Sequence, residues 1–571
     1  MKKYFKKISA LLMAAIMVLT MCATVFAAAV SDKNTATITI TGLNTDETPT
    51  VRLYKVVKGN YSEQGFLGTY TNANGVAITD LNNPTEAEIN AIAQGIAAGT
   101  ISSYADGTSV EEVTATVNGD TATATATGAG VYIALITGAT KTVYNPLYIG
   151  VSYNKNSELS HDRISAGDLY ANTAVAKKTS PKIEKDITGG IKADGDKATV
   201  SVGDVINYKL TPTVPSYPTN AVNKTFFVSD TMSSGLDFNF TSLTLAAAGH
   251  KVTPTANSDN TVTYTIDGIT VATAAKVGNG FNMNFSYDGL DSLNAENAKG
   301  TMPALTVTYN ARVNENAVVG GEGNTNDAEI YYSNTPNDGK TWDRVDEKPG
   351  KGNGIENKTD TKTVYSYQLA LKKVDGVDAN KVLAGAVFGI YEDEACTKLV
   401  DEITTNENGY AVSTAVAKGT YYVKELVAPT GYKLSAKVYP VDAQWTTATS
   451  TVTGETIRTS YTTEKDKSVD GKQVGWILND KFYNMNNKPA GDDVKAAYVA
   501  STSSTTATDV SVVENKNGVV PTLVASPVPN TTLSQLPSTG GMGTYLFTIV
   551  GVVLMACAAG AFFMSRKKTQ E

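Results

Sequence analysis

Two lysines of this sequence sit on expected strands whose alternate side chains are otherwise apolar. Lys185 falls between Ile183 and Ile187, and Lys373 follows Leu371 on the same face. Because the side chains of a strand alternate between its faces, each lysine should point into a core. A charged ammonium is costly to bury, so each amine is expected to lose its proton, and a neutral lysine is a nucleophile.

The same alternation offers an acid and an amide for each lysine. Asp230 and Glu425 share strand faces with apolar residues, and so do Asn326 and Asn515. Burial keeps a carboxylic acid protonated, which lets it hydrogen-bond an amide carbonyl and move protons. An amine beside such a pair can attack the amide and release ammonia, leaving an isopeptide crosslink that forms once, without turnover. The alternative is a set of edge strands whose lysines extend to solvent.

Other chemistry finds little support in the sequence. His161 and His250 are the only histidines, and no Ser/His/Asp set, Cys/His set or phosphate-binding loop stands out. The formal net charge of −8 is mild for 571 residues and argues against nucleic-acid binding. Cys22 and Cys557 lie in terminal apolar segments, so Cys396 has no partner for a disulfide. No enzyme activity beyond self-crosslinking, no metal and no cofactor are predicted.

Both termini carry processing signals. Lysines followed by the apolar run Ile8–Val25 predict a cleaved signal peptide over residues 1–27. Near the other end, Thr544–Met564 is long and apolar enough for a membrane-spanning helix, with a basic tail after it. Just before this helix stands the motif Leu536, Pro537, Ser538, Thr539 and Gly540. This order resembles the LPXTG sorting signal of sortase substrates, which implies cleavage after the threonine and attachment to peptidoglycan. An ordinary single-pass membrane protein is the alternative.

The elements that must position these groups are mostly strands. Short runs rich in Thr, Val and Tyr, separated by Gly, Asn and Pro, predict a mainly β fold of tandem Ig-like sandwiches. Expected strands include 35–41, 131–137 and 305–313, and the clearest helix lies at 84–98, with Thr85 as its N-cap. The predicted domains are an N-terminal domain at 28–173, a middle domain at 180–336, a linker at 337–361, a third domain at 362–517, a spacer at 518–535 and the sorting signal at 536–571.

Two of these domains resemble known families. In the third domain, Leu371–Asp375 and Leu383–Phe388 resemble the opening pattern of a collagen-adhesin B-type domain. Tyr422–Tyr432 resembles the E-box of pilins, with Leu426 where threonine is usual. The middle domain resembles the fimbrial isopeptide-forming domain through the segments Val202–Tyr208, Val228–Met232 and Asn326–Tyr332.

The resemblance implies one crosslink in each of these two domains. Carried over onto this sequence, the implied sets are Lys185–Asn326 with Asp230, and Lys373–Asn515 with Glu425. Asn484 and Asn486 remain alternatives to Asn515. Such crosslinks would replace the missing disulfides, and each would add about 5 kcal/mol in the chain-entropy picture.

A separate lysine precedes the middle domain. Val175–Ser180 resembles the pilin motif, whose lysine attacks the sortase-held threonine of another subunit. Lys178 aligns best and Lys177 is the alternative, although the usual aromatic residue and proline are here Ala176 and Lys177. Joining of Lys178 to Thr539 is a head-to-tail contact that does not close, so it predicts a filament.

Together these motifs resemble those of a sortase-assembled Gram-positive major pilin. The resemblance implies a secreted, wall-anchored shaft subunit of a surface pilus that supports adhesion. Its implied partners are other subunits, sortase and peptidoglycan, and a host surface ligand is left open. The alternative is a monomeric, peptidoglycan-anchored adhesin in which Lys178 is inert.

Overall fold

The computed structural model of the chain describes residues 31–153, 159–160, 173–218, 220–293, 302–319, 322–443, 452–478, 481–485, 488–510 and 520–532. Two compact units divide the chain, one over residues 1–318 and 322–365 and the other over 319–321 and 366–571. The predicted signal peptide and sorting signal lie outside the described residues. Within the described ranges, no helix is long and apolar enough to cross a membrane.

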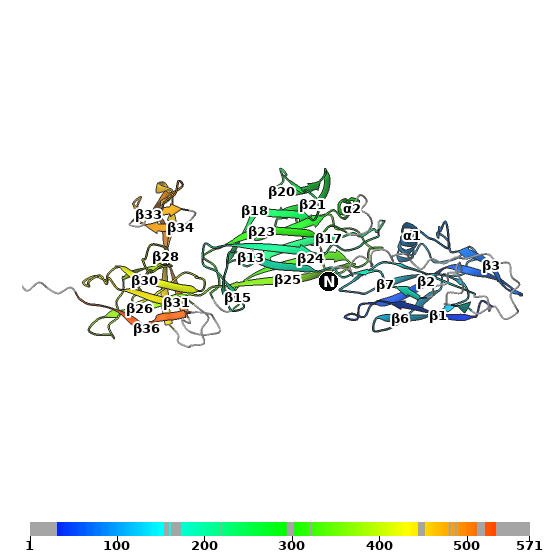
Figure 1. Ribbon diagram of the computed structural model, residues 1–571, viewed down its shortest axis with the longest axis horizontal. Helices are drawn as coiled ribbons and strands as arrows, with labels where there is room; N and C mark the ends of the chain where they lie inside the picture. Colours follow the sequence, from blue (N-terminus) through cyan, green and yellow to red (C-terminus); the bar gives the residue numbers. More distant parts are fainter. Residues whose placement is uncertain are drawn as a thin grey trace, which may run out of the picture. The chain divides into compact units, whose positions relative to one another are not determined.

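A β-sandwich forms the first part of the first unit (Figure 1). One sheet has the strand order β11-β1-β6-β5, and the other has the order β10-β9-β7-β2-β3 with β4 paired to β2. In β1 (Thr35–Thr41) and β6 (Thr121–Thr127), Ile and Ala point inward while Thr points outward. The other strands are β2 (Thr50–Ser62), β3 (Gly65–Asn72), β4 (Glu112–Thr114), β5 (Thr116–Asn118), β7 (Gly130–Thr137), β8 (Val143–Tyr144), β9 (Leu147–Tyr153), β10 (Leu159–Ser160), β11 (Thr173–Val175) and β12 (Lys178–Thr179).

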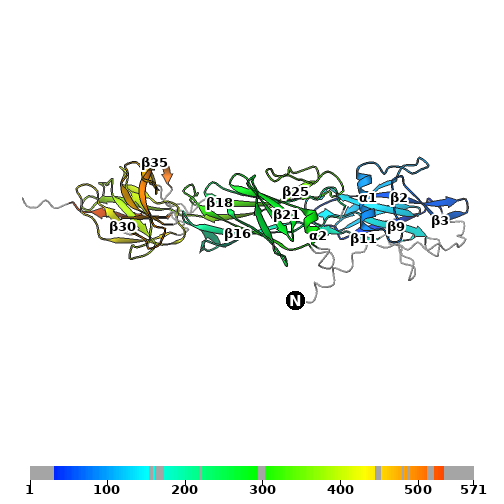
Figure 2. The same cartoon turned by 90° about the horizontal axis from the view of Figure 1, so that it is seen from above.

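The helix α1 (Glu86–Ala97) covers the outer face of the second sheet, and Figure 2 shows it from above. Its apolar side chains pack against Val131 and Ile133 of β7. The structure confirms Thr85 as the N-cap, in a reciprocal capping box with Glu88. Because the helix covers one face and the sandwich core the other, β7 is buried almost throughout.

The middle domain completes the first unit with a larger sandwich. One sheet has the order β13-β16-β23-β18, and the other has the order β14-β15-β25-β24-β17-β22-β21-β20-β19. Aromatic and aliphatic side chains from both sheets fill one continuous core. The elements are β13 (Ile183–Gly189), β14 (Lys192–Asp194), β15 (Lys197–Thr199), β16 (Val205–Pro212), β17 (Phe226–Met232), β18 (Leu236–Ala247), β19 (Thr253–Ala256), β20 (Thr261–Ile266), β21 (Ile269–Lys276), β22 (Gly280–Phe285), α2 (Tyr287–Ser292), β23 (Leu305–Val313), β24 (Asn324–Ser333) and β25 (Ile355–Tyr365).

The prediction of a linker over 337–361 is wrong at its C-terminal end. Strand β25 lies within the middle domain, between β15 and β24, and pairs with β24 from Asn324–Val364 to Ser333–Ile355. Its sequence IENKTDTKTVY has few apolar residues, so it lacks the alternation that marked the other strands. Backbone pairing with two neighbours holds this strand in place, together with the burial of Ile355 and Val364 near its two ends.

The second unit contains the third domain. Two of its sheets have the orders β29-β26-β36 and β28-β27-β30-β31, and their side chains share a core. A further sheet has the order β32-β35-β33-β34. The elements are β26 (Leu369–Asp375), β27 (Val387–Tyr391), β28 (Leu399–Thr404), β29 (Tyr410–Val412), β30 (Gly419–Val427), β31 (Val438–Ala443), β32 (Val452–Thr462), the 3-10 helix η1 (Lys465–Lys467), β33 (Gln473–Leu478), β34 (Lys481–Asn484), β35 (Lys495–Val510) and β36 (Val520–Asn530).

The prediction of an extended spacer over 518–535 is also wrong. Most of that segment is strand β36, which pairs in parallel with β26, as Figure 1 shows. Its prolines at 521, 527 and 529 favoured a spacer in the sequence. The strand lies at the edge of its sheet, where a residue without an N–H is tolerated.

Candidate functional site

A buried lysine and a buried acid face each other in the core of the middle domain. Lys185 comes from β13 and Asp230 from β17, so the two opposed sheets each supply one group. Lys185 Nζ donates a hydrogen bond to Asp230 Oδ2 at 2.6 Å, and both side chains are fully buried. Lys185 therefore points into the core, which the alternation of Ile183, Lys185 and Ile187 predicted, and it does not extend to solvent.

The amide of Asn326 completes this site through a tyrosine. Asn326 lies on β24, beside β17, where it pairs in register with Met232. Its Nδ2 donates to the Tyr309 hydroxyl at 3.2 Å, and that hydroxyl donates to Asp230 Oδ2 at 2.6 Å. Asn326 Oδ1 and Asp230 Oδ1 are buried and have no hydrogen-bond partner among the described residues. The sequence predicted three of these side chains and missed Tyr309, which reads as a core aromatic residue.

Burial favours the uncharged forms of the acid and the amine. Desolvation lowers the pKa of Lys185, although the nearby Asp230 carboxyl acts in the opposite direction. Desolvation likewise raises the pKa of Asp230, against the effect of Lys185. A proton shared across 2.6 Å can therefore sit on the acid, leaving the amine free as a nucleophile.

Aromatic rings enclose the polar groups of this site. Lys185 Nζ lies 5.3 Å from the ring centroid of Tyr208 and 5.7 Å from that of Tyr309. These two rings stack with centroids 5.4 Å apart, and Phe281 and Phe238 pack edge-on against Tyr309. This wall keeps water from the amine and the acid, which strengthens every interaction between them.

The third domain brings together a second set of the same kinds of groups. Lys373 on β26 and Glu425 on β30 are fully buried, with Nζ and Oε1 3.8 Å apart. Asn530, the last residue of β36, donates from Nδ2 to Oε1 and Oε2 of Glu425 at 2.9 and 3.0 Å. Lys373 Nζ donates to the backbone oxygen of Val528 at 2.9 Å. Burial lowers the pKa of Lys373 to about 8, with Glu425 opposing that shift.

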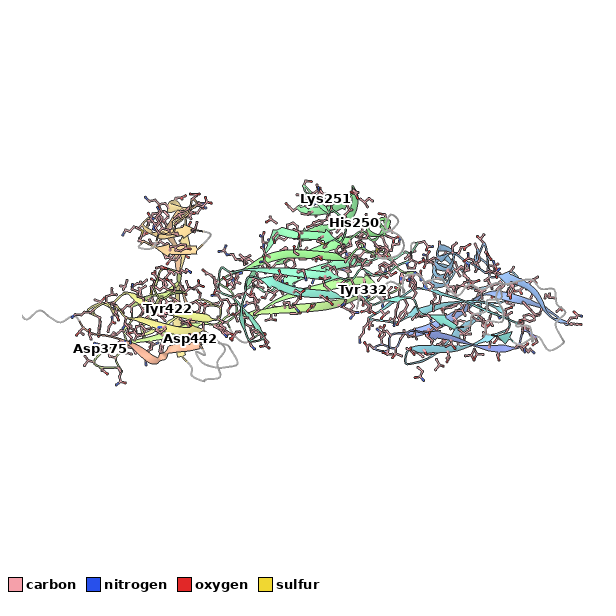
Figure 3. The ribbon with its side chains drawn as sticks, viewed as in Figure 1. His250, Lys251, Tyr332, Asp375, Tyr422 and Asp442 are labelled. Carbon is pink, nitrogen blue, oxygen red and sulfur yellow. The ribbon has the colours of Figure 1, made fainter. Side chains whose placement is uncertain are left out.

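Asn530 was not among the candidates from the sequence. Asn515 and Asn486 lie outside the described residues. Asn484 ends β34, in a sheet that contains neither β26 nor β36. The structure instead places Asn530 at Glu425 because β36 pairs with β26, with Asn530 in register with Asp375, which Figure 3 labels. The available signal was the alternation of Val528 and Asn530, which the prolines of the segment obscured.

The pilin-motif lysine lies on a short strand beside the middle domain. Lys178 pairs with Tyr144, and Thr179 pairs with Val143. Val143 belongs to a buried cluster with Tyr332, a β24 residue labelled in Figure 3. The Tyr332 hydroxyl also donates to the backbone oxygen of Thr140 at 2.9 Å. The strand that carries Lys178 is thus held where the first and middle domains meet.

Lys177 and Lys178 have different surroundings. The Lys178 side chain is exposed and forms no ion pair with the described part of the chain. Lys177 Nζ lies 3.5 Å from Glu86 Oε1, at the start of α1. Its backbone oxygen accepts a hydrogen bond from the Asn145 amide at 3.0 Å. The sorting motif from Leu536 to Gly540 lies outside the described residues.

Comparison with known proteins matches four family profiles along the chain. They are the T6 antigen Ig-like domain over residues 32–178, the Gram-positive pilin backbone subunit 2 Cna-B-like domain over 202–336, the prealbumin-like fold domain over 367–457 and the LPXTG cell wall anchor motif over 528–571. The anchor profile covers the predicted sorting signal.

Relatives at the level of the whole chain agree with these profiles. The trypsin-resistant surface T6 protein of Streptococcus pyogenes serotype M6 is 43% identical over 547 residues, which cover 95% of this chain and 96% of the relative. The solved structure of the T6 backbone pilin of serotype M6 Streptococcus pyogenes is 40% identical, with a TM-score of 0.70. That match covers 89% of this chain and 100% of the solved chain. The chain therefore belongs to the Gram-positive backbone pilins and is a subunit anchored to the cell wall at the bacterial surface.

Proposed function

We propose that this backbone pilin forms one isopeptide bond inside each of two domains. We further propose that sortase joins it covalently to its neighbours in the pilus shaft. The observation that carries the proposal is the burial of a lysine, a carboxyl group and an asparagine together in each of two domains. The proposed bonds are Lys185–Asn326, promoted by Asp230, and Lys373–Asn530, promoted by Glu425.

The chemistry follows from the neutral state of the groups. The Lys185 amine attacks Cγ of Asn326, and the proton on Asp230 is available to the Asn326 Oδ1 as negative charge develops there. The Nζ–Cγ bond forms, the Cγ–Nδ2 bond breaks and ammonia leaves. Asp230 ends the reaction as it began, so it acts as a catalyst of a single internal event. In the third domain the same bonds form and break when the Lys373 amine attacks Cγ of Asn530 beside Glu425.

The two bonds would carry force in different ways. In the middle domain, Lys185 and Asn326 belong to opposite sheets, so the bond ties the sandwich across its core. In the third domain, Lys373 and Asn530 lie on neighbouring parallel strands, and Asn530 stands directly before the segment that leads to the sorting motif. Tension on that domain would pass from β26 to β36 through the bond, without unfolding the sandwich.

Polymerisation would use the exposed Lys178 and the sorting-motif threonine. Sortase, by this proposal, holds Thr539 of one subunit as a thioester and transfers it to the Lys178 amine of the next. Support comes from the exposure of Lys178 and from its fixed strand at the junction of two domains, since an exposed amine can reach an enzyme's site. Repetition of this step gives an open filament.

The intact mass of the mature chain, residues 28–539, tests the internal bonds. We expect a deficit of two ammonia molecules in the unsubstituted protein. Lys185→Ala and Lys373→Ala should each regain one, after correction for the substitution. Asp230→Ala and Glu425→Ala are matched variants that keep the lysine and the asparagine but remove the acid, and each should also regain one. An unmodified mass for the unsubstituted chain contradicts the proposal.

A further inference from the structure

The Tyr309 hydroxyl lies between the acid and the amide nitrogen of the middle-domain site. Tyr309 is on β23, in the sheet that also carries Lys185, and its hydroxyl crosses the core to the opposite sheet. It donates to Asp230 Oδ2 at 2.6 Å and accepts from Asn326 Nδ2 at 3.2 Å. The same Asp230 oxygen accepts from Lys185 Nζ at 2.6 Å. A continuous chain of hydrogen bonds thus connects the attacking nitrogen to the departing nitrogen.

Among the described residues of the third domain, the acid and the amide are arranged differently. There the Asn530 amide nitrogen contacts both oxygens of Glu425 directly, at 2.9 and 3.0 Å. Tyr432, a tyrosine that reaches the same sheet, donates its hydroxyl to Asp375 at 2.7 Å rather than to the amide or to Glu425. An acid that touches the amide nitrogen can protonate it without help, whereas in the middle domain the recorded path from acid to nitrogen runs through a phenol.

The departing nitrogen needs a proton at a defined moment. Once Lys185 Nζ bonds to Cγ, the Asn326 nitrogen loses its amide conjugation and becomes basic, so it changes from a donor into an acceptor. The attacking Nζ must release a proton at the same stage, and Asp230 is the acceptor in contact with it. Moving that proton to Nδ2 is general acid–base catalysis through positioned groups.

We propose that Tyr309 is a catalytic residue of the middle-domain crosslink, passing a proton from Asp230 to the departing Asn326 nitrogen. This inference rests on the Lys185–Asn326 bond proposed above. Tyr309 gives its hydroxyl proton to Nδ2 and takes one from Asp230 Oδ2, so it ends unchanged. Overall, the lysine amine and the asparagine amide give the isopeptide and ammonia, and no other reactant is needed.

The surroundings of Tyr309 suit a relay that must not ionise or move. Burial raises its pKa, and the nearby Asp230 charge adds to that effect, so the phenol keeps its proton. The ring is fixed by stacking on Tyr208 at 5.4 Å and by the edge contact with Phe281 at 5.2 Å. The Tyr208 hydroxyl is buried too and lies near the Asn326 side chain, but it makes no hydrogen bond to Asp230. The two stacked tyrosines therefore differ in their contact with the acid, because Tyr309 donates its hydroxyl to Asp230 and Tyr208 does not.

Tyr309→Phe and the matched control Tyr208→Phe test the proposal. Each mature chain, residues 28–539, is made by cell-free synthesis, sampled over time, denatured and digested. Mass spectrometry then follows the crosslinked peptides that contain Lys185 and Lys373. The rate at which the Lys373 bond forms in the third domain serves as the internal reference within the same molecule. We expect Tyr309→Phe to slow formation of the Lys185 bond by about 100-fold or more relative to that internal reference. Tyr208→Phe should change this rate little.

The outcomes separate the relay from packing and from the crosslink itself. An unchanged rate in Tyr309→Phe, or equal slowing in Tyr208→Phe, overturns the relay. An unsubstituted chain that never forms the Lys185 bond overturns the proposed crosslink instead. Uncrosslinked Lys185→Ala chains with and without Tyr309→Phe should melt alike if the ring alone maintains packing. If the two variants melt differently, fluorinated tyrosine at position 309 replaces Tyr309→Phe, because it keeps the shape of the ring. The relay then requires the rate of Lys185 bond formation to change with the acidity of the fluorinated hydroxyl.

Discussion

The backbone amide of Lys185 donates a hydrogen bond to Asp360 Oδ2 at 2.7 Å. Lys185 lies on β13, at an edge of one sheet, and Asp360 lies on β25 of the opposite sheet. Strand β25 follows Asn326 in the chain, so the proposed middle-domain bond does not enclose it. In the β24–β25 pair, Asn326 faces Lys362 near the open end of the hairpin. Tension between Asn326 and the end of β25 would separate β24 from β25 one residue pair at a time. The hydrogen bond from Lys185 to Asp360 holds β25 to β13 and opposes this separation.

Asp360→Ala should therefore weaken the first step of forced unfolding. Loss of a hydrogen bond to a charged acceptor is expected to cost about 2 kcal/mol of stability. Single-molecule pulling of the mature chain should show β25 peeling away at lower force, with the crosslinked core still folded. Asp360→Asn keeps an oxygen acceptor but loses the charge, so it is the control and is expected to peel at a force between those of Asp360→Ala and the unsubstituted chain. Equal peeling forces for Asp360→Ala and the unsubstituted chain would show that Asp360 does not hold β25.

Asn530→Ala should abolish the third-domain bond, because Asn530 is the amide that contacts Glu425. The intact mass of this variant should show one ammonia deficit fewer than the unsubstituted chain. Asn515→Ala is the comparison, and it should leave both deficits in place. If Asn515 were required and Asn530 dispensable, the bond would instead be Lys373–Asn515, as the family resemblance implied.

The uncrosslinked third domain should gain stability as the pH rises. In Asn530→Ala, Lys373 keeps its amine, whose pKa in the fold is lowered by burial to about 8 from the usual 10.5. Between these values the unfolded chain binds more protons than the folded chain, so stability increases with pH, by up to about 1.4 kcal/mol per unit. Below about pH 8, Lys373 is protonated in both the folded and the unfolded chain. Its contribution to stability is then constant and unfavourable.

Denaturant unfolding of that variant at several pH values measures the slope. The unsubstituted chain is the control, since the proposed bond converts the amine to an amide that no longer titrates. A flat profile between pH 8 and 10.5 in Asn530→Ala would mean that Lys373 is not desolvated in the fold. The same slope in both proteins would mean that the amine is still free in the unsubstituted chain.

Lys178→Ala should abolish polymerisation, because the exposed amine of Lys178 is the proposed acceptor for Thr539. Surface extracts of bacteria that express this variant should lose the ladder of high-mass species and keep single subunits. Lys177→Ala is the matched control, since its ammonium lies beside Glu86 at 3.5 Å. Loss of the ladder in Lys177→Ala alone would assign the acceptor to the neighbouring lysine.

The sequence determined the class of fold and much of the chemistry. Period-two alternation placed Lys185, Asp230 and Asn326 on inward faces, because that signal depends only on neighbours along one strand. The N-cap at Thr85 was equally predictable, since a capping box is formed within a few residues. The terminal motifs are local too, and the LPXTG anchor profile matches the C-terminal one.

Tertiary structure alone decided which inward groups meet. Alternation carries no information on which strands become neighbours, so it could not choose Asn530 for Glu425 or bring β36 beside β26. It also left Tyr309 as one core aromatic residue among many, although its hydroxyl joins the acid to the amide. Strand β25 was missed because its apolar residues do not alternate along the strand and its main support is pairing with neighbouring strands. Contacts between residues far apart in the chain depend on how whole sheets pack, and a local pattern does not record that packing.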